Sequence, residues 1–171
     1  MGYICRNCLF RNYNWIIMLR EFEALEASEV ELMLKAPILV CMLVAGADGK
    51  IDSREINKAI QVARRKAKSN NVLWQYFSVA SEDFEDKLRI LLQDYPAAAD
   101  TRNEILVKEL ADLNAVLPRV ESSFRRQFYS LLRELAREVA ASSGGLLGYN
   151  AIDKEEAKYI GLDMIQPPEL I

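Results

Sequence analysis

The chain has 171 residues, of which 51% are hydrophobic and 27% are charged, values that are ordinary for one soluble globular domain with its own core. The net charge of −3 gives no electrostatic reason to bind nucleic acid, and we expect no nucleic-acid partner. The sequence contains no histidine, which excludes Ser-His-Asp and Cys-His catalysis and histidine metal ligands. A metal would therefore need cysteines or oxygen ligands, and oxygen suits hard cations such as Ca²⁺, Mg²⁺ and Mn²⁺.

Residues 1–19 are predicted to form an extension that precedes the domain. This stretch is a poor signal peptide, because it has no sustained apolar core and no small-residue cleavage site. One interpretation is that translation begins at Met18. The alternative is that Trp15, Ile16 and Ile17 pack on the domain or at a lipid surface, which leaves peripheral membrane association open. No segment approaches the roughly 20 apolar residues that span a bilayer.

The cysteines are Cys5, Cys8 and Cys41, an odd number that argues against a secreted disulfide framework. Cys5 and Cys8 have the spacing of half a zinc knuckle. The sequence offers no second cysteine pair and no histidine pair to complete it, so the spacing favours no functional role for these two thiols.

Helical periodicity dominates from the start of the domain, and β-alternation is scarce. A helix is predicted from Ser28 or Glu29 to Leu34, joined to an earlier one around residues 20–27. Pro37 favours the first position of a new helix that is apolar almost all round, which is typical of a central buried helix. This helix is expected to end between Gly46 and Gly49.

Further helices are predicted along the rest of the chain. One starts at Asp52, a short aromatic one covers residues 72–80, and Ser81 caps the next, which ends at Pro96. The following two run from about residue 100 to 117 and from 121 to 141, and a last helix starts at Asp153. Each of these helices except the aromatic one is predicted to turn an apolar face to the core. In the helix from Asp52 and the helix capped by Ser81, these faces are Ile56, Ile60 and Ala63, and Phe84, Leu88, Leu91, Leu92 and Tyr95. In the last three helices, in chain order, they are Leu106, Leu110, Leu113 and Leu117; Phe124, Phe128, Leu131, Leu135 and Val139; and Ala157, Ile160 and Met164.

The sequence thus predicts an all-α fold, a single compact bundle of about seven to eight helices over residues 20–166, followed by a tail over 167–171. The aromatic side chains Trp74, Tyr76 and Phe77 are expected in the core, since no basic groove surrounds them in the sequence.

An acidic phrase occurs twice, each time at the predicted start of a helix. The first copy runs over residues 48–55 and the second over residues 149–156, and both contain Ile-Asp, two residues and then Glu. The candidate functional residues of this chain are the carboxylates of these two corners: Asp48, Asp52, Glu55, Asp153 and Glu156.

One interpretation of the corners is purely structural. Asp52 with Glu55, and Asp153 with Glu156, fit a capping-box variant in which the Asp accepts from an amide inside the helix and the Glu reaches back. Each such cap stabilises a helix by about 1 kcal/mol. Capping leaves Asp48 without an explanation.

The other interpretation is a cation site. Residues 48–55 match the second half of an EF-hand calcium loop, but the first and third positions would fall on Val44 and Gly46, which carry no side-chain oxygen. The second corner has Tyr149 and Asn150 in place of the Asp-Gly pair. If the corner carboxylates converge, they supply oxygen ligands for Ca²⁺, Mg²⁺ or Mn²⁺.

The run Ala47-Asp48-Gly49-Lys50-Ile51-Asp52-Ser53-Arg54-Glu55, which follows an apolar helix, resembles the hallmark of the TerB-like tellurite-resistance family. The resemblance implies an all-helical fold with a repeated acidic helix-turn-helix unit. It also implies a cytoplasmic bacterial protein of tellurite, metal or other stress resistance, with the acidic corners as divalent-cation sites. Only the first copy of the motif is specific.

We therefore expect a non-enzymatic module that binds protein partners, and the alternative is an adaptor whose acidic corners are only helix caps. A metal-dependent hydrolase is a third class, which turnover with Mn²⁺ or Mg²⁺ that is lost in Glu55→Gln would reveal. A basic stripe of Arg126, Arg133 and Arg137 is open to an acidic partner or anionic lipid, or is a solvated face paired with Glu134 and Glu138.

Overall fold

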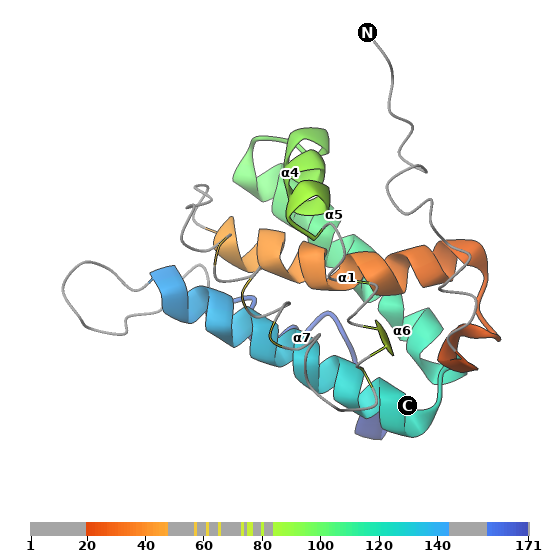
Figure 1. Ribbon diagram of the computed structural model, residues 1–171. Coiled ribbons are helices and arrows are strands. Elements are labelled where there is room, and N and C mark those ends of the chain that lie inside the picture. The colour runs from red at the N-terminus through yellow and green to blue at the C-terminus, as the bar shows by residue number, and fades with distance from the viewer. Residues whose placement is uncertain are drawn as a thin grey trace, which may run out of the picture.

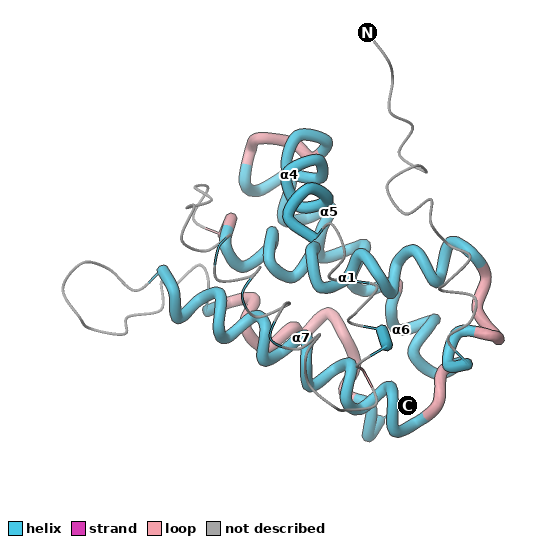
Figure 2. The backbone as a smooth tube through the Cα atoms, viewed as in Figure 1, coloured by secondary structure: helices cyan, strands magenta, loops and turns pink. Residues whose placement is uncertain are grey.

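The computed structural model describes residues 20–47, 84–143 and 157–170, together with the single residues 57, 61, 65, 73, 75, 76 and 80. These ranges contain helices and turns and no strand, which confirms the all-α prediction (Figures 1 and 2). The elements are η3 (Arg20–Phe22), α1 (Ala27–Ala45), α4 (Phe84–Asp94), α5 (Ala99–Ala111), α6 (Leu113–Val116), η4 (Leu117–Arg119), α7 (Ser122–Ser143) and η5 (Pro168–Leu170).

Helix α1 lies at the centre of the described elements. It contacts α7 on one side and α4 and α5 on the other, and α6 meets it near its beginning (Figure 1). From Ala36 to Ala45 every side chain of α1 is buried, as the apolar composition of this stretch predicts. None of the described helices is long and apolar enough to cross a membrane.

The predicted boundary at Pro37 is wrong, because α1 is one continuous helix with this proline inside it. A proline has no backbone N–H, so the carbonyl of Met33, four residues earlier, loses its helical donor. The hydroxyl of Tyr76 donates to this carbonyl instead, at 2.8 Å. A buried side chain therefore satisfies the backbone group that the proline leaves open, and two predicted helices merge into one.

The predicted last helix is also wrong over its described part. Ala157 is helical, but turns follow, and Leu162 has a φ of 52°, a left-handed conformation that an α-helix does not contain. Leu162 and Ile165 are buried. The side-chain amide of Asn114 donates to the Met164 carbonyl and accepts from the Gln166 N–H, both at 2.8 Å, and so ties this turn to α6.

The described ranges contain four helices of eleven residues or more, fewer than the seven or eight predicted. The merger of α1 and the turns after Ala157 account for two of the missing helices, and the stretch around residues 20–27 forms only the short helix η3. The predicted helices over residues 52–68 and 72–80 lie almost wholly outside the described residues.

The predicted inner faces of the middle helices are confirmed. Leu106, Leu110, Leu113 and Leu117 are buried, although the last two lie in α6 and η4 rather than in α5. All five predicted core residues of α7 are buried as well. Phe84, Leu88, Leu91 and Tyr95 are buried, and Leu92 is half-buried against the core.

Four aromatic rings from three segments of the chain pack at the beginning of α7. The ring of Tyr76 meets those of Phe22, Phe124 and Phe128 edge to face, with centroids 5.4 to 6.2 Å apart. Such pairs add stability beyond the area they bury. The predicted core position of Tyr76 is confirmed, and its ring joins η3, α1 and α7.

Replacing Tyr76 with Phe is expected to destabilise the protein by about 1–3 kcal/mol, because the Met33 carbonyl would remain buried without a donor. Urea denaturation measures this change. Tyr129→Phe is the control, since Tyr129 is only half-buried on α7 and its ring lies beside Arg133. Equal stability of Tyr76→Phe and the native chain would contradict the account of Pro37.

Stability is also expected to depend on Tyr76 at high pH. Burial raises the pKa of Tyr76 well above its ordinary value of 10.0. The folded state then holds a proton that the unfolded state loses, so this contribution is complete below pH 10 and is lost as pH rises above it. Between about pH 9 and 11, Tyr76→Phe should therefore lose less stability than the native chain. Parallel losses of stability in the two proteins would contradict this prediction.

Candidate functional site

The five predicted site residues, Asp48, Asp52, Glu55, Asp153 and Glu156, all lie outside the described residues. Their roles as caps or as cation ligands stay predictions. Near these residues the structure describes the end of α1 at Ala45, three residues before Asp48, and the chain over residues 157–170. The part of the chain that the structure describes contains no group of three or more Cys, Asp or Glu side chains that could hold a metal ion.

The end of α1 carries a buried cation from α5. The Arg102 guanidinium, on a side chain that is 6% exposed, donates from Nη2 to the Gly46 carbonyl at 2.5 Å and from Nη1 to the Ala97 carbonyl at 3.4 Å. Gly46 is the C-cap of α1. A positive charge at this position complements the negative end of the helix dipole and fixes α5 to α1 immediately before the first acidic corner.

Sequence reasoning missed Arg102, although a signal for it exists. Arg102 lies four residues before Leu106 and therefore continues the buried leucine stripe of α5. A charged residue on an apolar stripe indicates a buried polar contact, because burying an unpaired charge costs far more than burying a leucine gains.

Gly46 is required by Arg102 and not by its own backbone, since its φ of −99° suits any residue. A Cβ there would lie 2.5 Å from Arg102 Nη2 and 2.8 Å from the Met42 carbonyl oxygen. Gly46→Ala is expected to cost about 1–3 kcal/mol of stability through overpacking. In an Arg102→Met background the same change should cost less, which a double-mutant cycle in urea measures, and strict additivity would contradict the clash.

The described thiol is chemically inert. Cys41 is buried in α1, and burial raises its pKa well above the ordinary value, so the group stays protonated at neutral pH. A protonated, enclosed thiol is neither a nucleophile nor a metal ligand.

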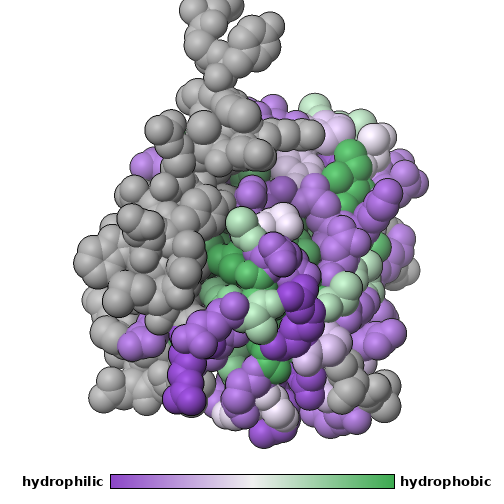
Figure 3. Space-filling view, turned by 90° about the vertical axis from the view of Figure 1, so that its right-hand side faces the viewer, coloured by the Kyte–Doolittle hydropathy of each residue, from purple (hydrophilic) through white to green (hydrophobic). Residues whose placement is uncertain are grey.

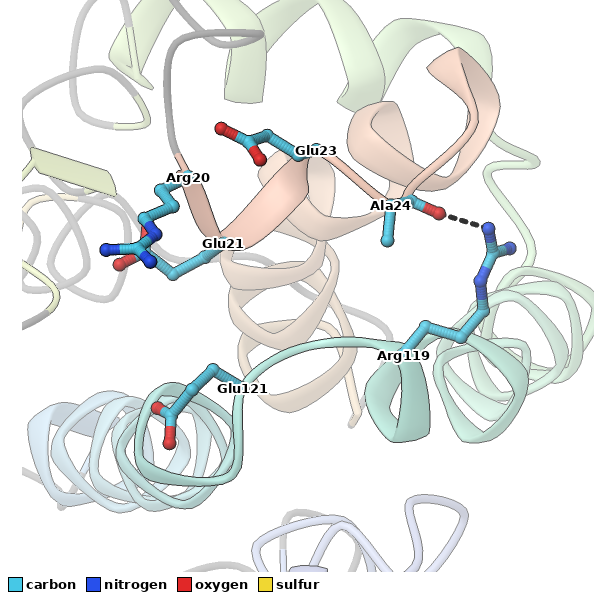
Figure 4. Close-up of a pocket in the computed structure, with 6 residues that line it drawn as sticks. All are labelled: Arg20, Glu21, Glu23, Ala24, Arg119 and Glu121. Carbon is cyan, nitrogen blue, oxygen red and sulfur yellow. Dashed lines mark hydrogen bonds between the residues drawn. The ribbon is translucent and has the colours of Figure 1, made fainter.

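The structure forms a hollow of about 510 Å³ between η3 and η4, lined by Arg20, Glu21, Glu23, Ala24, Arg119 and Glu121. Figure 4 shows that its charged groups do not point to a common centre: Arg119 donates to the Ala24 carbonyl, and Glu121 points away from it. Backbone N–H groups of Ser123 and Phe124 lower the pKa of Glu121, because this carboxylate caps α7. The hollow thus has no convergent set of groups for one ligand.

A second hollow is a groove of about 490 Å³ between the first half of α1 and the junction of α5 with α6. The described residues of its walls carry four carboxylates and one ammonium, and its apolar side chains are those of Leu32, Ala115 and Val116. The residues that line it are Ser28, Glu29, Glu31, Leu32, Lys35, Glu109, Asp112, Ala115 and Val116. We call it the α1–α5 groove.

Ion pairs fix both ends of the α1–α5 groove. At one end Lys35 Nζ lies 2.7 Å from Glu109 Oε2 and 5.2 Å from the centroid of the Tyr95 ring, and the Tyr95 hydroxyl donates to Glu109 at 2.8 Å. At the other end Arg119 pairs with Glu29. These contacts hold α5 and η4 against α1, so the walls of the groove are set by side chains that are already paired.

The face at the right of Figure 1, where α1 begins and α6 lies, is turned to the viewer in Figure 3. Hydrophilic residues dominate the described part of this face, and hydrophobic residues are exposed in small separate patches. Polar and charged residues therefore make up most of the described surface on this face.

The basic stripe of α7 makes contacts within its own neighbourhood. Arg126 donates to the Ser122 hydroxyl, and the Arg133 guanidinium lies 5.8 Å from the centroid of the Tyr129 ring. Glu138 pairs with Arg65 at 3.4 Å. Two of the three arginines thus make local contacts on α7, and the choice between a solvated, paired face and a lipid or acidic-partner site stays a prediction.

Comparison of the sequence and the structure with family models, curated proteins and solved structures found no significant match. The TerB-like resemblance thus rests on the sequence of the first acidic corner.

Proposed function

We propose that this chain is a non-enzymatic helical module that acts by binding a protein partner. The single observation that carries the proposal is the α1–α5 groove, whose walls are held in place by ion pairs at both ends. A preformed surface binds with little loss of conformational entropy, which is what a docking module needs.

The chemistry of the groove supports binding rather than catalysis. Glu109 is held by both Lys35 and the Tyr95 hydroxyl, so it is committed to the wall of the groove. A catalytic carboxylate is instead set against a reacting group, usually beside a nucleophile or a bound metal. The described residues that line the groove include no nucleophile paired with a base.

The resemblance to the TerB-like family adds a physiological setting to the proposal. In this setting the module works in the bacterial cytoplasm, in resistance to tellurite or metal stress, through protein partners. The proposed partner binding at the groove does not depend on the resemblance, and it would stand for a module with no role in tellurite stress.

Binding at the groove is testable in cells that produce the protein. A photoreactive amino acid in place of Ala115, an exposed residue of the groove, should give a crosslinked species heavier than the chain. The same amino acid in place of Glu104, exposed on α5 outside the groove, is the control and should give none. Equal adducts at both positions, or none at either, would contradict the proposal.

A divalent-cation site at the acidic corners is the second candidate function. It is favoured by the sequence position of Asp48, shortly after the end of α1, because the negative end of a helix dipole attracts positive charge. The ligands would be Asp48, Asp52 and Glu55, with Asp153 and Glu156 from the second corner.

Thermal melts in chelator and then with Ca²⁺, Mg²⁺ or Mn²⁺ test this candidate. A cation at a hundredfold its dissociation constant should stabilise the protein by about 2.7 kcal/mol, and Asp48→Ala should abolish the shift. Glu104→Ala is the matched control and should keep it. A shift that is absent with every ion would leave the corners as helix caps, for which Asp52→Ala costs about 1 kcal/mol with or without metal.

A further inference from the structure

The α1–α5 groove carries an excess of negative charge that its own cations do not cancel. Of its four carboxylates, Glu109 is paired with Lys35 and Glu29 with Arg119. Glu31 and Asp112 have no ion pair among the described residues. Among the described residues of the groove, these two carboxylates are the charges left open to a ligand.

The two carboxylates come from opposite walls. Glu31 belongs to α1, and Asp112 lies between α5 and α6. Leu32 on α1, which is half-buried, and Ala115 on α6, which is exposed, supply apolar surface to the groove. The groove therefore offers one open carboxylate on each wall together with apolar surface.

We infer that the α1–α5 groove binds a basic segment of a partner protein, with an arginine or lysine side chain placed between Glu31 and Asp112. This inference rests on the proposed function and names the chemistry of the partner. The aliphatic stem of such a side chain covers Leu32 and Ala115 while its charged end reaches the carboxylates. Arginine suits this arrangement best, because its guanidinium presents several donors in a fixed plane.

Other ligands fit the groove less well. An acidic segment would meet Glu31 and Asp112 with like charge, and Lys35 is held by Glu109 and lies against the Tyr95 ring. A neutral apolar segment would take water from two carboxylates and give them no partner. A bare divalent cation would find only one open carboxylate on each wall, and hard cations take six or more oxygen ligands.

The test uses the full chain, isotopically labelled, and three capped peptides that differ only in charge. The basic probe is acetyl-Gly-Leu-Arg-Leu-Arg-Leu-Gly-amide, and the others carry citrulline or glutamate at both arginine positions. Citrulline is close to arginine in shape and has no charge. The basic peptide should shift the backbone amide signals of residues 28–35 and 109–116, and the citrulline and glutamate peptides should shift them little.

Two variants decide whether the open carboxylates are responsible. Glu31→Gln combined with Asp112→Asn should weaken binding of the basic peptide about three- to thirtyfold, as expected for two partly exposed ion pairs. Glu104→Gln removes one negative charge from α5 outside the groove and should leave binding of the basic peptide unchanged. Binding should also weaken as the salt concentration is raised from about 50 to about 300 mM, because salt shortens the Debye length and screens partly exposed charges.

The outcomes separate this inference from the proposed function. If the citrulline or glutamate peptide shifts the groove signals as strongly as the basic one, the groove is a docking surface but its ligand is not basic, and the inference is overturned. If no peptide shifts these signals at millimolar concentration, the inference is overturned and the crosslinking result at position 115 decides the proposed function by itself. Unchanged binding in the double variant would also overturn it.

Discussion

The hydrogen bond from the Tyr76 hydroxyl to the Met33 carbonyl is the contact on which the rest of the described structure depends. Helix α1 is buried over most of its length and contains a proline, so one of its carbonyls has no donor within the helix. Tyr76 supplies that donor and packs its ring among aromatic side chains of η3 and α7. Because α1 contacts every long described helix, its continuity sets the positions of the others.

The two ends of α1 explain where charge is gathered. At its beginning, the Glu29 carboxylate accepts hydrogen bonds from the Glu26 N–H and from Arg119. The same carboxylate therefore caps the N-terminus of α1 and forms the ion pair at one end of the groove. At its end, Arg102 binds the Gly46 carbonyl next to the first acidic corner. The groove and the Arg102 contact therefore lie toward opposite ends of α1.

Much of this fold could be predicted from the sequence where periodicity governs it. The leucine and phenylalanine stripes of α5, α6 and α7 are buried as expected, because an apolar face must find the core. Local rules failed where a residue distant in sequence overrides them. The helix continues through Pro37 because the Tyr76 hydroxyl donates to the Met33 carbonyl, and the turn at Leu162 is held by hydrogen bonds to Asn114. The groove could not be predicted, since Glu31 and Asp112 are far apart in the sequence and line one groove only because α1 packs against α5 and α6. The corner carboxylates lie outside the described residues.

The central claim is that a basic side chain enters the α1–α5 groove between its two walls. Intermolecular nuclear Overhauser effects between the labelled chain and an arginine peptide test it most directly. We predict contacts from the methyl groups of Leu32 and Ala115 to the arginine side-chain methylenes. Contacts from methyl groups outside the groove instead, with none from these two residues, would contradict it.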